Sequence, residues 1–156
     1  MAQIHMWSSM SKTTTLSDTL LSQSTSVFTL VVVAKEGNIQ RCYDEANRAI
    51  THASIEPSIL SEESIVLVNP QVVTSTNYGP RNPSSFEVFH PYSPERHGKQ
   101  ALSASYDAGS YIGRLGYSTK FALVRADMFI FACAKNASDL ATCLGLLKSK
   151  LGHQLK

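Results

Sequence analysis

Long hydrophobic runs are missing from this sequence of 156 residues. The longest run, residues 27–34, is interrupted by Thr29 and covers less than half of the roughly 20 residues that a membrane-spanning helix needs. We therefore expect no transmembrane segment. An excess of charge of one sign is missing too, because 14 basic and 12 acidic residues give a net charge of +2. Any phosphate binding must therefore be local rather than spread over the whole surface.

Cysteine is scarce, with only Cys42, Cys133 and Cys143. An odd number of cysteines in a chain without a recognisable secretory signal argues against a disulfide framework, and it favours a reducing, cytoplasmic compartment. The sequence also lacks the C-x-x-C, H-x-x-x-H, G-x-S-x-G and phosphate-loop patterns. We therefore expect neither a metal nor a cofactor, and we assign no catalytic residue.

The chain divides into two parts by composition. Residues 8–26 contain twelve Ser or Thr out of nineteen, which is too little apolar surface to offset the entropy of ordering. Residues 1–26 are therefore predicted to be a flexible Ser/Thr-rich arm. Residues 27–156 carry the apolar periodicity of a single domain, since one core is expected at this length.

The apolar patterns of the domain predict an α+β fold. β-Branched runs predict strands and apolar stripes at helical spacing predict helices. The predicted strands are residues 27–33, 65–68, 86–90, 121–124 and 128–133, and the predicted helices are residues 39–53, 99–115 and 137–152. Together they predict two layers, with a four- or five-stranded, mainly antiparallel sheet and helices packed on it.

Two of these helices share a pattern of apolar residues. The stripe that contains Cys42 recurs around Cys143 with an offset of 101 residues. This indicates an internal β-α pseudo-repeat, although any two amphipathic helices have similar stripes. Both cysteines then lie among aliphatic side chains, which favours buried, unreactive thiols over nucleophiles.

The region from residue 74 to 117 is the candidate site. Residues 74–99 hold four of the six prolines and are predicted to be a long loop. Within this loop and in the residues that follow it, aromatic side chains alternate with guanidinium and imidazole groups. This composition is typical of surfaces that anchor peptides, bases or phosphates. With Trp7, which is unusual at a chain terminus unless something covers it, the predicted binding residues are Tyr78, Arg81, Phe89, His90, Tyr92, Arg96, His97, Lys99, Tyr111 and Arg114.

Three functions remain open at this point. The first is a non-enzymatic protein–protein interaction or assembly protein, as an oligomer or as a subunit of a larger complex. It is favoured by the lack of a catalytic constellation and by opposed charge, since residues 27–75 carry minus three and residues 76–156 carry plus five. The second is nucleic-acid or phosphate-ligand binding through residues 78–117. The third is a small enzyme that uses the His, Glu and Tyr side chains of residues 90–97.

Overall fold

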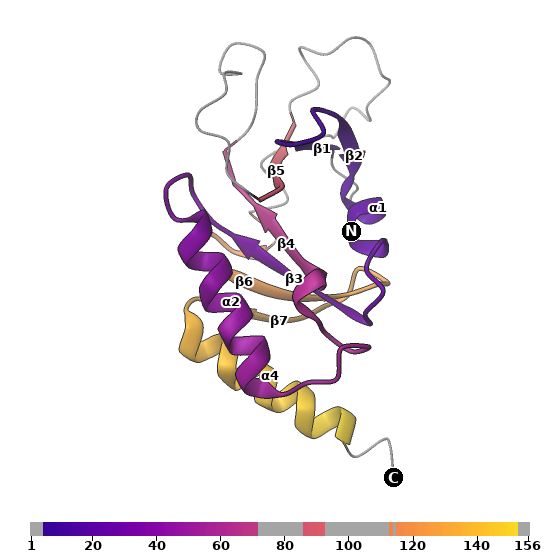
Figure 1. Ribbon diagram of the computed structural model, residues 1–156, viewed down its shortest axis with the longest axis vertical. Helices are drawn as coiled ribbons and strands as arrows, with labels where there is room; N and C mark the ends of the chain where they lie inside the picture. Colours follow the sequence, from indigo (N-terminus) through magenta and orange to yellow (C-terminus); the bar gives the residue numbers. More distant parts are fainter. Residues whose placement is uncertain (1–4, 72–85, 93–112, 114, 153–156) are drawn as a thin grey trace.

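A computed structural model describes residues 5–71, 86–92, 113 and 115–152 (Figure 1). Within these residues seven strands form one sheet: β1 (His5–Ser8), β2 (Thr14–Leu16), β3 (Phe28–Val33), β4 (Ile65–Val68), β5 (Val88–Pro91), β6 (Phe121–Arg125) and β7 (Ile130–Ala134). The helices of the same residues are α1 (Ser17–Ser22), α2 (Ile39–Ala53), α4 (Ala137–Gly152) and a short 3-10 helix, η1 (Glu62–Ser64).

The sheet is open and mixed, in the order β2-β1-β5-β4-β3-β6-β7. β3, β4 and β5 run parallel, and every other pair of neighbours is antiparallel. The α+β class is confirmed. The prediction of four or five mainly antiparallel strands is wrong, because the sheet has seven strands and mixes parallel with antiparallel pairs. Two parallel strands need a crossover, which α2 supplies between β3 and β4. β1 and β2 add two strands of four and three residues that the sequence did not predict.

The first β-α unit follows directly from its residues. All six residues of β3 are apolar or β-branched, and five of them are buried. Gly37 has a φ of +89°, a backbone conformation that suits glycine, in the turn before α2. Along α2 the buried residues are Cys42, Ala46 and Ile50, which confirms the predicted stripe and the buried Cys42 thiol.

The amino-terminal segment, predicted above as a Ser/Thr-rich arm, contributes β1, β2 and α1 to the fold. Met6 and Leu21 have only 1% and 2% of their surface exposed. They pack on the sheet face opposite α2 and α4, with Val31 and Phe89 among their neighbours. A few apolar residues spaced along a polar segment are therefore enough to seat it against the sheet.

Two cores lie on the two faces of the sheet. α2 and α4 pack side by side on one face (Figure 1), and the larger core fills the space beneath them. Its fully buried members include Leu30, Phe121, Leu140, Leu144 and Leu147. The layer of two helices predicted for residues 39–53 and 137–152 is confirmed.

The predicted helix over 99–115 and most of the predicted loop over 74–99 lie outside the described residues. Within that loop the predicted strand 86–90 corresponds to β5. Among the helices of the described residues, none combines the length and apolar character that crossing a membrane requires.

Candidate functional site

Four of the eleven predicted binding residues lie in the described part of the chain: Trp7, Phe89, His90 and Tyr92. β1 pairs with β5 in antiparallel register, with Trp7 opposite His90. Tyr92 follows β5 and packs against Trp7. The structure thus brings Trp7, His90 and Tyr92 together, although the first is more than 80 positions from the other two. We call these three residues the Trp7 cluster.

The remaining predicted residues divide into two groups. Phe89 neighbours His90 in β5, so its side chain points to the other face of the sheet, where it packs in the core with Met6. The structure therefore separates Phe89 from the Trp7 cluster. The rest lie outside the described residues: Tyr78, Arg81, Arg96, His97, Lys99, Tyr111 and Arg114.

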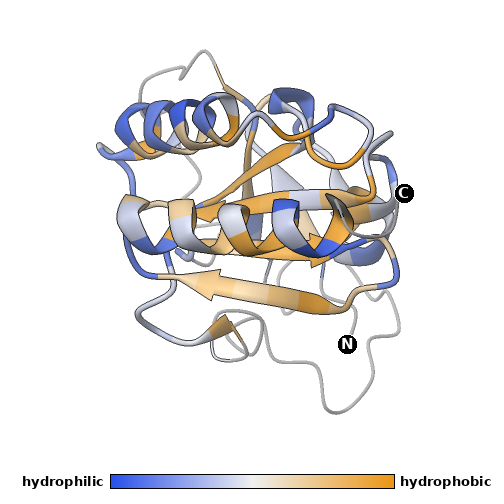
Figure 2. Ribbon diagram, turned by 90° about the horizontal axis from the view of Figure 1, so that it is seen from below, coloured by the Kyte–Doolittle hydropathy of each residue, from blue (hydrophilic) through white to orange (hydrophobic). Residues whose placement is uncertain are grey.

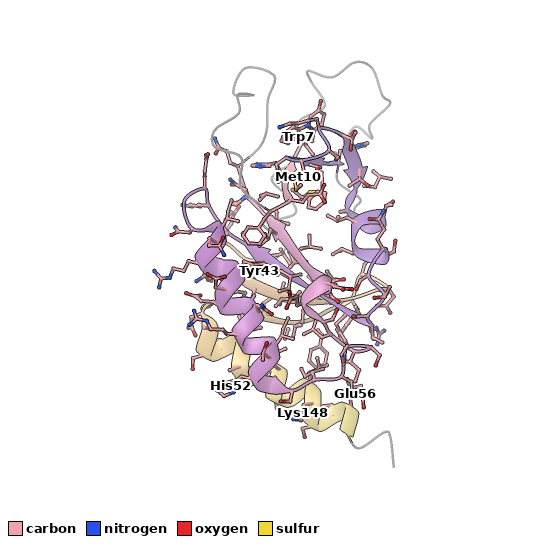
Figure 3. All side chains as sticks on the ribbon, in the orientation of Figure 1. Trp7, Met10, Tyr43, His52, Glu56 and Lys148 are labelled. Atoms are coloured by element: carbon pink, nitrogen blue, oxygen red, sulfur yellow. The ribbon has the colours of Figure 1, made fainter. Side chains whose placement is uncertain are left out.

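The geometry of the Trp7 cluster is that of a packed aromatic group. The ring centroids of Trp7 and His90 are 5.9 Å apart at an interplanar angle of 55°, and the Lys12 ammonium lies 5.2 Å from the Trp7 ring. Trp7 and Tyr92 each have less than a tenth of their surface exposed. Figure 3 shows Trp7 at the β1 end of the molecule, far from the α2–α4 layer that carries His52 and Lys148.

The surroundings of His90 favour the neutral form of its imidazole. Its Nδ1 lies 3.3 Å from the carbonyl oxygen of Gln71. Burial lowers the pKa of His90, because it disfavours the imidazolium, and the Gln71 carbonyl and the charge of Glu36 offset this in part. A neutral imidazole beside aromatic rings can stack or hydrogen-bond with a ligand but supplies little positive charge.

A second surface was not anticipated from the sequence. Phe129, Phe131 and Leu146 are large apolar side chains with 59%, 37% and 57% of their surface exposed. The ring of Phe131 meets the edge of Phe28, which belongs to the core beneath the helices, so Phe131 lies on the helix-bearing face. We call β7 together with Phe129 the β7 edge.

Leu146 is the exposed large apolar side chain of α4, whose residues Leu140, Leu144 and Leu147 are buried. Lys148 donates a hydrogen bond to the carbonyl oxygen of Ala53 at the end of α2, so this flank of α4 faces α2. Leu146 is two residues earlier, about 200° around the helix, and therefore lies on the flank away from α2.

The β7 edge is an unprotected margin of the sheet within the part of the chain that the structure describes. β7 is the last strand in the order and pairs there with β6 alone. Its sequence, Ile-Phe-Ala-Cys-Ala, contains no charge and no proline. Figure 2 shows it coloured apolar along its length, beside α4. The opposite margin, β2, has three residues and is largely polar.

One irregularity marks β7. Leu123 of β6 pairs with Ala132 and Val124 with Ile130, so Phe131 is the extra residue of a β-bulge. Beyond the bulge the pairing is regular, with Ala122 opposite Cys133. Ala122 belongs to the core opposite the helices, so the exposed Cys133 points to that face. The sequence predicted the β6–β7 hairpin, whereas its place at the margin depends on the strand order.

Among residues 5–71, 86–92 and 115–152, no three His, Cys, Asp or Glu side chains gather in a way that could hold a metal ion. Glu45 accepts a hydrogen bond of 2.6 Å from Lys120, which lowers the pKa of Glu45. Cys42 lies near the same lysine, but burial is the larger effect and raises the pKa of its thiol. Cys42 is therefore a core thiol rather than a nucleophile.

The chain was also compared with known proteins. No protein family, no curated protein and no solved structure matches it. The function is therefore argued from the described surfaces.

Proposed function

We propose that this protein is a non-enzymatic interaction or assembly domain that binds a protein partner through the β7 edge. The observation that carries the proposal is an uncharged, proline-free edge strand with the exposed side chains of Phe131 within it and Phe129 directly before it. A free strand edge offers unpaired main-chain groups to another strand, and proteins usually protect such edges with charges, prolines or very short strands. Of the features that protect an edge strand, β7 has only its β-bulge.

Strand addition explains the composition of this edge better than binding of a small ligand does. In strand addition, main-chain hydrogen bonds supply affinity and the flanking side chains supply specificity. Aromatic side chains are enriched in such interfaces and charged ones are depleted from their centres. Before β7, in the hairpin turn, Arg125 and Asp127 form an ion pair with each other, and the first charge after the strand is Lys135.

The two other functions have less support. Nucleic-acid or phosphate binding rests mainly on basic residues between 78 and 114 that lie outside the described residues. The acid–base enzyme needs Glu95 and His97, which lie there too, while its other members, His90 and Tyr92, belong to the Trp7 cluster. We do not propose dithiol redox chemistry. Such chemistry uses a C-x-x-C motif beside a β-α-β unit, and here the β3–α2 turn, residues 34–38, contains no cysteine.

Site-specific photocrosslinking tests the proposal. A photoreactive phenylalanine analogue replaces Phe131 in one variant and Tyr117 in a control variant. Tyr117 is 91% exposed and lies outside β7. Irradiation of cells should give discrete protein adducts from position 131 and none of the same mass from position 117.

A second variant connects the adducts to the strand edge itself. Cys133→Lys places a charge in β7 at an exposed position, and Cys133→Ser is its neutral control. Adducts at position 131 should disappear with Cys133→Lys and remain with Cys133→Ser. Identical adducts at positions 131 and 117, or adducts that survive the lysine, would contradict the proposal.

A further inference from the structure

We draw no further inference here: the strongest candidate, the exposed aromatic patch of Phe129 and Phe131 at the β7 edge, belongs to the site already described, and nothing in the structure shows what covers it.

Discussion

His90 links the packing of the Trp7 cluster to pH. Because burial lowers its pKa, the folded protein binds fewer protons at this residue than the unfolded chain does. The contribution of His90 to stability is therefore complete above the ordinary histidine pKa of about 6.5, and it is lost as the pH falls through the lowered value. We expect the melting temperature of the wild type to fall more between pH 7.5 and pH 5 than that of His90→Gln.

Fluorescence gives a local check on the same residue. Trp7 is the single tryptophan of the chain and lies against His90, so its emission reports this cluster alone. Emission in the folded protein should change with a midpoint below pH 6.5 and stay flat in His90→Gln. A midpoint at or above 6.5 would show that the imidazole is not held neutral by burial.

Met128 occupies a backbone conformation that side chains disfavour. Its φ is +67° in the turn between β6 and β7, where its N–H donates to the carbonyl oxygen of Arg125. Met128→Gly and Met128→Ala both remove the side chain and differ only in the Cβ atom. We expect the glycine variant to be more stable by about 1 kcal/mol, because the left-handed region costs residues with a Cβ about that much. Urea unfolding measures the difference, and an alanine variant of equal stability would contradict it.

At the scale of the element, α4 has one buried and one exposed apolar flank. Leu144 is fully buried in the core and Leu146 is more than half exposed, although they are two residues apart. Leu144→Ala should lower the free energy of unfolding by about 2 to 5 kcal/mol, because it leaves a cavity. Leu146→Ala should change it by less than about 0.5 kcal/mol, because the side chain of Leu146 lies on the surface. Similar losses in both variants would mean that α4 is rotated.

Local patterns predicted the elements well because each carries its own periodicity. β3 is a continuous β-branched run, and α2 and α4 each have a stripe of apolar residues at helical spacing. The strand order could not be predicted in the same way, because β1 and β5 pair across most of the chain and three or four residues carry no clear period. The candidate site shows the same limit, because its residue types could be predicted and their arrangement in space could not.

The residues of the Trp7 cluster were predicted, but their contact with one another was not. Trp7, His90 and Tyr92 were singled out by residue type, but only the β1–β5 register shows that they meet. The β7 edge gave no comparable signal, because Phe129 and Phe131 in an apolar strand are equally consistent with a strand at the centre of a sheet. The physical reason is that exposure depends on which neighbours a strand has, and sequence periodicity does not contain that information.

At the scale of the whole molecule, the amino-terminal segment decides whether β5 has a partner on its outer side. Deletion of residues 1–26 removes β1, β2 and α1, and with them the buried side chains of Met6 and Leu21. Burial of two such side chains contributes roughly 3 kcal/mol or more. We expect the deletion variant to melt at a clearly lower temperature. An unchanged melting temperature would show that this segment is a dispensable arm.

The pairing of β1 with β5 also sets an order of events in folding. Ser8 hydrogen-bonds to Glu87, 79 positions later in the chain, whereas the β6–β7 hairpin closes over a turn of four residues. Contacts between distant residues carry a larger loop-closure cost and form late. During synthesis, β1 must therefore wait until β5, more than 80 positions later, has been made. Until then Met6 lacks the cover that Phe89 gives it, and Trp7 lacks the cover of His90 and Tyr92.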